Sequence, residues 1–403
     1  MNVMGFSKSE REIHRHSIHL TNVLLKSFPP HDQVTIKLTG STLEGMSGGF
    51  YSNQSHRDID MLLTLINIKL CTPRTNNINN HPLFPLHDNE DYDAFFFVEE
   101  DDNFPGYVKL SLAEVKTNCV YLKCCTRMND GKLYLSNSMM MDSLYKKTGE
   151  DSIIPIEMHP MLETYQQING PSRTFYNKLY KGRVQPEDKV HCIHYDVWPN
   201  SANLFITRSK PNNWPSNSML KNIQSQGCDV VPIGHHDGKN NDIQWRISFP
   251  GESNLLLDLN DIQILCYVLI KTILKETLKT SQREVVSSFH IKHVMLWCVE
   301  SYSCHWVGSN YINCLNICLA KLIQKIKDRH IPHYIIESRN LFNSKMTEKM
   351  SREIVDVLSK YDTTHVFTLD AFERVFEETH FNNALLKHEA LKSKIMACFI
   401  AYT

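Results

Sequence analysis

The alternation of apolar and polar residues predicts strands in the first half of the chain. Residues 34–38 alternate between the two classes, as a strand with one buried face does. A second extended, apolar-rich run covers residues 58–65. Shorter runs of the same kind predict further strands at 190–193 and 230–233. The first half therefore predicts a sheet.

Apolar residues recur at helical spacing in the remainder of the chain and before the first strand. Ser9 and Glu12 fit a capping box that opens an N-terminal helix, which Pro29-Pro30 ends. From residue 255 onward the helical pattern dominates, with successive helices predicted around 265–274, 291–297 and 315–326. The whole pattern predicts an α+β protein in which a mixed sheet precedes a helical lobe.

In three segments the apolar residues follow neither the strand spacing nor the helical spacing. We expect the Asn-rich stretch at 75–80 and the acidic stretch at 88–102 to be surface insertions. Residues 126–180, which prolines interrupt, are predicted to be irregular.

Two carboxylates, Asp58 and Asp60, lie on one face of the second predicted strand, because residues i and i+2 of a strand point the same way. Carboxylates held so close repel each other unless a cation lies between them, and Mg²⁺ is a hard cation that prefers oxygen ligands. The turn at Gly40-Ser41 precedes them and could direct backbone N–H groups at a phosphate chain. Although Asp-x-Asp pairs also occur without metal, this combination points to a metal-dependent nucleotidyltransferase.

Composition narrows the class of protein. The chain has 403 residues, 42% hydrophobic and 22% charged, with a net charge of −1 and a pI of about 7.0. No overall basicity favours strong general binding of double-stranded DNA. The polar N-terminus and the lack of an apolar run near membrane-spanning length predict a cytoplasmic protein without a membrane partner. In that compartment the twelve cysteines should be reduced and serve mainly as buried apolar side chains.

A series of short motifs resembles the Mab (male abnormal) nucleotidyltransferase family, which includes cyclic GMP-AMP synthase (cGAS) and the animal cGAS-like receptors. The motifs follow the family's order across residues 30–345, and the tryptophan-led block at 245–249 is the most specific. They are Gly40-Ser41, Asp58-Ile-Asp60, Pro105-Gly-Tyr107, Asn169-Gly-Pro171, Trp198-Pro199, Trp214-Pro215, Gly227-Cys228, Val231-Pro232, Trp245-Arg-Ile-Ser-Phe249, Leu269-Ile-Lys271, Ser287-Ser-Phe-His290 and Asn340-Leu-Phe342.

The resemblance implies a bilobal fold: a nucleotidyltransferase core with an N-terminal spine helix over 1–254, and a helical HhH/H2TH-like lobe over 255–403. It implies that Asp58, Asp60 and Asp188 hold two Mg²⁺ or Mn²⁺ ions. Asp188 is preferred to Asp196 as the third acid because of its distance from Trp198-Pro199.

Further nucleotide contacts are implied by the same resemblance. Gly40 and Ser41 would hold the donor triphosphate, together with Lys271 and Ser288. Arg246 and Ser248 match acceptor-base contacts, with Glu252 as an additional nucleotide contact, and Phe289 would stack on a base. Each also has an ordinary structural explanation, such as a surface ion pair for Arg246, a solvated position for Lys271 or a core position for Phe289.

The implied activity is that of a cGAS-like receptor that senses a ligand and makes a cyclic dinucleotide from ATP, GTP or related triphosphates. An inactive scaffold or regulatory relative is the alternative, and an enzyme that extends polynucleotide ends is a third. The activating ligand stays open, with double-stranded RNA or another nucleic acid as candidates. The best candidate contacts are the basic residues of the N-terminal helix, which could equally form a solvated helix face: Lys8, Arg11, Arg15 and Lys26. We expect a monomer or a ligand-induced dimer.

No zinc is expected. The zinc insertion of the vertebrate DNA-sensing member of the family is absent between Glu252 and Cys266, and the interval from Gly40-Ser41 to Asp58 is longer than in cGAS. The histidine pairs His14/His16, His191/His194 and His235/His236 have no cysteine partners at ligand spacing, so ordinary structural roles are favoured.

Overall fold

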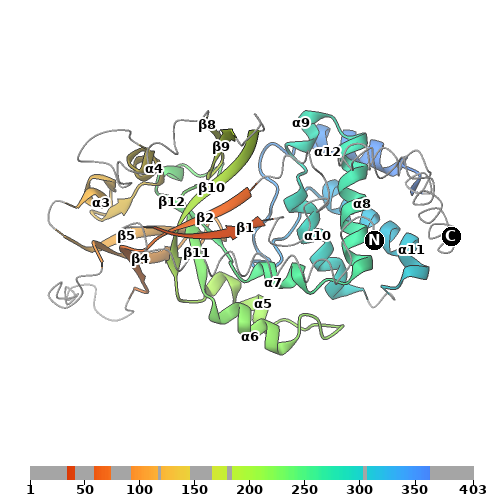
Figure 1. The fold of residues 1–403 in the computed structure, drawn as a ribbon, viewed down its shortest axis with the longest axis horizontal. Coiled ribbons are helices and arrows are strands. Elements are labelled where there is room, and N and C mark those ends of the chain that lie inside the picture. Colours follow the sequence, from red (N-terminus) through yellow and green to blue (C-terminus); the bar gives the residue numbers. More distant parts are fainter. Residues whose placement is uncertain are drawn as a thin grey trace.

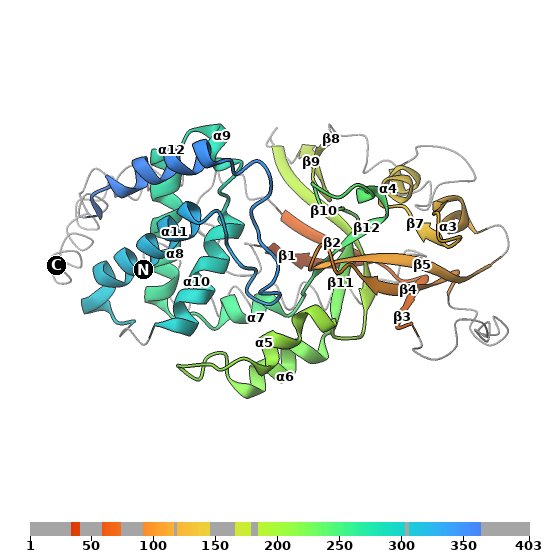
Figure 2. The same ribbon diagram turned by 180° about the vertical axis from the view of Figure 1, so that it is seen from behind.

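A mixed β-sheet and a helical lobe make up the described part of the chain, so the predicted α+β class is confirmed. The computed structural model describes residues 34–40, 59–73, 92–116, 119–145, 166–178, 184–302 and 306–363. The predicted N-terminal helix with its basic residues, and also Ser41 and Asp58, lie outside these ranges. The sheet and the helical lobe lie at opposite ends of the molecule (Figures 1 and 2).

Eight strands form the main path of the sheet in the order β1-β2-β10-β11-β12-β5-β4-β3. The pairs β2–β10 and β3–β4 are parallel, and the other neighbours on this path are antiparallel. These strands are β1 (Val34–Thr39), β2 (Ile59–Leu65), β3 (Ile68–Cys71), β4 (Ala94–Glu100), β5 (Tyr107–Val115), β10 (Val184–Tyr195), β11 (Cys228–Val231) and β12 (Gln244–Ser248).

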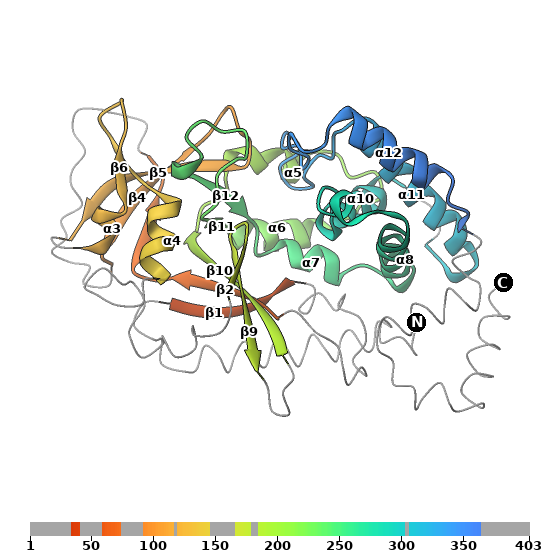
Figure 3. The same ribbon diagram turned by 90° about the horizontal axis from the view of Figure 1, so that it is seen from above.

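Four further strands attach to this path. They are β6 (Cys125–Arg127), β7 (Leu133–Leu135), β8 (Gln166–Asn169) and β9 (Ser172–Lys178). Strand β7 pairs with β5, and β9 pairs with the first half of β10. Figure 3 shows β9 and the adjoining first part of β10 extending together away from the rest of the sheet.

The prediction of irregular structure over residues 126–180 was wrong. This region contains β7, β8, β9 and the helix α4 (Asn137–Tyr145). The prediction that 88–102 is a surface insertion was also wrong for its second half, because β4 lies there and buries Phe96 completely. The run of apolar residues from 94 to 98, buried on both faces, is typical of a strand inside a sheet and outweighs the acidic residues beside it.

Helices dominate the chain after β12, as predicted. The longest are α8 (Asp261–Thr277), α10 (Ser288–Ser301) and α11 (Tyr311–Lys327), which cover the three predicted segments. Asn260 opens α8 with a capping box. The other α-helices are α3 (Val120–Lys123), α5 (Asn203–Thr207), α6 (Asn217–Ser225), α7 (Glu252–Leu257), α9 (Thr280–Arg283) and α12 (Glu348–Ser359), with short 3-10 turns at Asn200–Ala202, Asn241–Ile243 and Gly308–Asn310.

The division at residue 254 falls inside α7 and stays a prediction. One hydrophobic core runs from the sheet into the helical lobe. Trp245 on β12 is fully buried in it, and its indole N–H donates to the carbonyl of Leu135 at 3.0 Å. Most cysteines in the described residues are buried, and all of these described cysteines are free thiols, as expected. No helix in these ranges is long and apolar enough to cross a membrane.

A buried ion network joins the segment after α5 to the end of α10. The guanidinium of Arg208 donates two hydrogen bonds to the Glu300 carboxylate, at 3.1 and 3.0 Å, and stacks over the Trp297 ring. The Tyr334 hydroxyl donates to the same carboxylate at 2.7 Å. Lys210 Nζ lies 3.6 Å from it. This network fixes the helical lobe against the sheet side of the molecule.

Candidate active site

Two predicted acids face each other across neighbouring strands. Strands β2 and β10 run parallel, and their register pairs Asp60 with Asp188. Directly paired residues in a parallel ladder share a face of the sheet. The same face continues to Thr64 and Cys192, whose side chains hydrogen-bond at 3.3 Å. The two carboxylates therefore leave the sheet on one side at neighbouring positions.

The Asp188 carboxylate is held by the strand on its other side. Thr174 on β9 pairs with Asp188, and its buried hydroxyl donates a hydrogen bond to an Asp188 carboxylate oxygen. This contact fixes the carboxylate and leaves its other oxygen lone pairs for a cation.

Asp196, the competing candidate, lies elsewhere. It follows the opposite end of β10, eight residues beyond Asp188, which is roughly 26 Å along an extended strand. Its carboxylate hydrogen-bonds to Lys69 and lies 3.3 Å from His194 Nε2. The hydrogen bond from Lys69 lowers the pKa of Asp196 below its usual value. Asp196 is therefore an exposed ion-pair residue away from the paired acids.

Gly40 lies against the first of the paired acids. It follows β1, whose last residue, Thr39, pairs with Asp60. Its φ is +72°, and a Cβ atom built there would lie 1.8 Å from Asp60 Oδ2. Only glycine allows this approach. The turn predicted at Gly40 and the acid at Asp60 are thus parts of one site, where β1 ends and β2 begins. Strand β1 points toward the helical lobe (Figures 1 and 2).

Strand β12 carries two of the predicted nucleotide contacts on one face. Arg246 and Ser248 alternate with the buried residues Trp245 and Ile247. Arg246 is partly buried rather than exposed, and no carboxylate of the described residues forms an ion pair with it. Burial and the neighbouring guanidinium of Arg339 lower the pKa of Arg246 to about 10, which leaves it protonated near neutral pH.

The start of α10 presents Ser288 and Phe289. Ser287 caps this 14-residue helix, and Ser288 is its first residue, where unpaired backbone N–H groups favour an anion. The Phe289 side chain is 40% exposed and meets the His293 ring edge-on at 4.5 Å between centroids. Phe289 is therefore not a plain core residue. Lys271 is exposed on α8.

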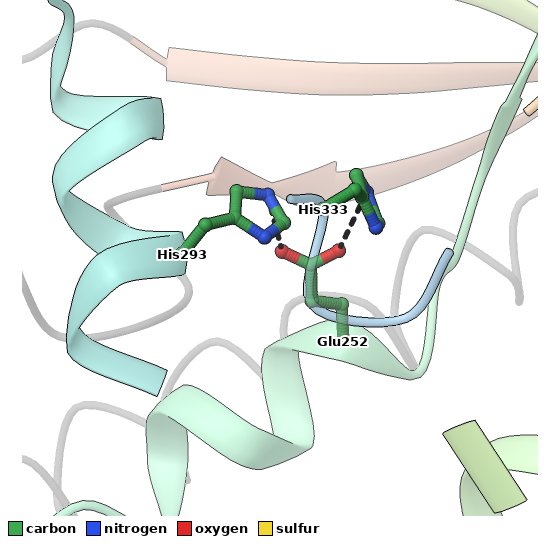
Figure 4. Close-up of side chains that lie close together, drawn as sticks. All are labelled: Glu252, His293 and His333. Atoms are coloured by element: carbon green, nitrogen blue, oxygen red, sulfur yellow. Dashed lines mark ion pairs between the residues drawn. The ribbon is translucent and has the colours of Figure 1, made fainter. Parts of the chain in front are cut away.

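Glu252, at the start of α7, lies between two buried histidines (Figure 4). Its Oε1 is 3.6 Å from His293 Nε2 on α10, and its Oε2 is 3.9 Å from His333 Nε2 in the segment after α11. The two rings lie 4.3 Å apart between centroids. Sequence reasoning missed this cluster because its members are about forty residues apart and no local spacing marks them.

The histidine pairs that the sequence singled out have ordinary surroundings where they are described. His191 is buried, and desolvation lowers its pKa to about 3. His194 Nδ1 lies 2.7 Å from Asp229 Oδ1, and this contact raises its pKa. His236 lies beside Asp237. The pair His14/His16 is outside the described residues.

Comparison with known proteins indicates the family. Residues 263–360 match the model of the Mab-21 protein HhH/H2TH-like domain. A "Protein mab-21-like" of Aedes aegypti is 25% identical over 286 residues, which cover 67% of this chain and 75% of that protein. These matches place the chain with the Mab-21 proteins, with distant similarity to cyclic GMP-AMP synthase.

Similarity to the synthases themselves is more distant. Mouse cyclic GMP-AMP synthase is 22% identical over 175 residues, 39% of this chain, and the pig enzyme is 23% identical over 190 residues, 42% of this chain. The match spans 34% of the mouse enzyme and 38% of the pig enzyme. The matched helical domain contains Lys271, Ser288 and Phe289. The acids lie before it, on the sheet.

Proposed function

We propose that this chain is a metal-dependent nucleotidyltransferase that joins nucleoside triphosphates into a cyclic dinucleotide, as a cGAS-like receptor does. The observation that carries the proposal is the pairing of Asp60 with Asp188 on one face of the sheet, with Gly40 packed against Asp60.

The donor chemistry of the acids fits hard divalent cations. Asp60 and Asp188 offer only carboxylate oxygens, which Mg²⁺ and Mn²⁺ prefer, and Asp58 would complete the set from two residues before Asp60. Two such ions, when bound, neutralise charge on the transferring phosphoryl group and its leaving group. The residues of the chain would then bind and orient the nucleotides and exclude water from the site.

The remaining predicted contacts divide into two groups by chemistry. Ser288 at the α10 N-terminus, with Lys271, Gly40 and Ser41, would bind the triphosphate. Arg246, Ser248 and Glu252 would bind the second nucleotide through polar contacts, and Phe289 would stack on a base. Correct placement of both nucleotides provides most of what phosphoryl transfer requires from a protein.

Incubation of the purified protein with labelled ATP and GTP and Mn²⁺ tests the proposal. A phosphatase-resistant product is expected, because a cyclic dinucleotide has no terminal phosphate. The same assay with double-stranded RNA and double-stranded DNA separately identifies the class of activating ligand. A protein that binds nucleotide but forms no product in any of these conditions would instead be the inactive scaffold, a role that the broad match to a mab-21-like protein leaves open.

A further inference from the structure

The Glu252 cluster contains two histidines whose protonation can be deduced from their backbone contacts. The rings of His293 and His333 are almost completely buried, at 0% and 2% exposure. The Tyr334 N–H donates to His293 Nδ1 at 3.0 Å. The N–H groups of Ile335 and Ile336 both donate to His333 Nδ1 at 3.1 Å. A backbone N–H can only donate, so Nδ1 of each ring must carry a lone pair.

Both rings are neutral near pH 7. Desolvation, and in His333 the adjacent His293 as well, holds the pKa of each ring well below its usual value. A neutral ring with a lone pair on Nδ1 carries its proton on Nε2. Each Nε2–H therefore faces a different oxygen of the Glu252 carboxylate.

This arrangement does not suit a metal ion, although one glutamate and two histidines are a common ligand set for zinc. A metal bound at Nε2 needs the lone pair there, and the other ring nitrogen then usually donates its N–H to an acceptor. Here both Nδ1 atoms already accept from N–H groups. The rings are built as donors toward Glu252.

Glu252 differs from the histidines in its access to solvent. Its side chain is 15% exposed, whereas those of His293 and His333 are 0% and 3% exposed. The Arg339 guanidinium lies close enough to be affected by its charge. Phe289 is exposed, and its ring lies edge-on to His293 at 4.5 Å and 6.3 Å from the His333 ring, between centroids.

We propose that His293 and His333 are positioning residues that hold the Glu252 carboxylate between two Nε2–H donors and so present it as a hydrogen-bond acceptor to the bound nucleotide. This inference rests on the proposed function, because it assumes that a nucleotide binds beside Phe289. It concerns only the placement of Glu252, and the ligand group it recognises is an N–H or O–H donor.

Matched substitutions separate positioning from a purely structural role. The amide of Gln places an N–H near the position of Nε2, whereas Asn places its oxygen near Nδ1. His293→Gln should keep the affinity for nucleotide within about twofold but lower the melting temperature, since the Tyr334 N–H loses its acceptor. His293→Asn should keep the melting temperature but weaken binding by about tenfold or more, because the Nε2–H that faces Glu252 Oε1 at 3.6 Å is lost and the carboxylate is no longer held from that side.

Binding is measured by calorimetry with non-hydrolysable ATP and GTP analogues and Mg²⁺, with Glu252→Gln as the reference for loss of the carboxylate. In Glu252→Gln the two histidine substitutions should no longer differ in affinity. The proposal is overturned if His293→Asn binds nucleotide as the unmodified protein does, or if His293→Gln and His293→Asn weaken binding equally.

A second measurement does not depend on nucleotide binding or activity. ¹⁵N NMR of histidine-labelled protein should show His293 and His333 as neutral Nε2–H tautomers, with the two signals assigned by the His293→Asn and His333→Asn variants. Nδ1–H tautomers, or stoichiometric zinc binding that Glu252→Gln abolishes, would refute the positioning role. If the tautomers are as expected and the unmodified protein binds neither analogue, the proposed function fails and the ligand part of this inference fails with it.

Discussion

Asp60 on β2 and Asp188 on β10 are partners in a parallel strand pair, although they are far apart in the sequence. Their register places both carboxylates on one face of the sheet, and Gly40 packs against the first of them. The site therefore depends on a backbone arrangement as much as on the acids themselves, and this can be tested residue by residue.

Gly40→Ala should reduce nucleotide incorporation by more than tenfold. The new Cβ would lie 1.8 Å from Asp60 Oδ2, so the carboxylate or the turn must move. Gly131→Ala is the control, because Gly131 has a similar φ of +81° and nothing within 4 Å of the added Cβ. Both variants carry a backbone cost of about 1–2 kcal/mol. Equal activity in the two variants would show that contact with Asp60 is unimportant.

Phe289→Ala should raise the KM for nucleotide by about tenfold with little change in melting temperature, because a stacked base gains about 1–3 kcal/mol from an aromatic ring. Phe289→Tyr should retain the ring and the affinity. Val307→Ala is the control for removing an exposed apolar side chain, since Val307 is 47% exposed. If Phe289→Ala behaves like Val307→Ala in steady-state kinetics, the stacking role is wrong.

Glu300→Gln should lower the free energy of unfolding by about 3 kcal/mol, because it leaves the buried Arg208 without its counter-charge. Urea denaturation measures the loss. Glu348→Gln removes an exposed pair with Arg352 and should change stability by less than about 0.5 kcal/mol. A similarly small effect at Glu300 would mean that the network does not hold the helical lobe in place.

Stability should fall as the pH drops from about 6.5 toward 5. Burial lowers the pKa of His191 to about 3 and of His290 to about 4, and holds those of His293 and His333 well below the usual value. In this range the unfolded chain binds protons that the folded state does not, so acid favours unfolding. Each histidine contributes at most about 1.4 kcal/mol per pH unit.

Urea denaturation at pH 7.5 and at pH 5.5 measures this dependence, at values where most carboxylates stay ionised. His191→Asn should show a smaller difference between the two pH values than the unmodified protein. Equal free energies of unfolding at both pH values in the unmodified protein would contradict the neutral state of these histidines.

The sequence predicted the helices and strands in which apolar residues recur at regular spacing. The alternation at 34–38 and the apolar run at 58–65 correspond to β1 and β2, and helical spacing found α8, α10 and α11. The same approach missed β8 and β9, where polar residues and prolines hide the strand signal. Pairing of β9 with β10, and of β8 with β9, stabilises these strands. Strand pairing is set by distant partners, which a local window does not contain.

The candidate site, too, could be predicted from the sequence only in part. The spacing before Trp198-Pro199 selected Asp188, which the register places beside Asp60, while its catalytic role stays a prediction. The contact of Gly40 with Asp60 and the cluster of Glu252, His293 and His333 could not be predicted, because they depend on how separate elements pack.

The most direct test compares nucleotide incorporation, with labelled ATP and GTP and Mn²⁺, in the unmodified protein and in three carboxylate variants. Asp60→Asn and Asp188→Asn should each abolish product while the melting temperature stays the same or rises, because loss of charge relieves repulsion between neighbouring carboxylates. Asp196→Asn should keep most of the activity, since Asp196 pairs with Lys69 at the other end of β10. Full activity in Asp60→Asn or Asp188→Asn, or loss only in Asp196→Asn, would contradict the account.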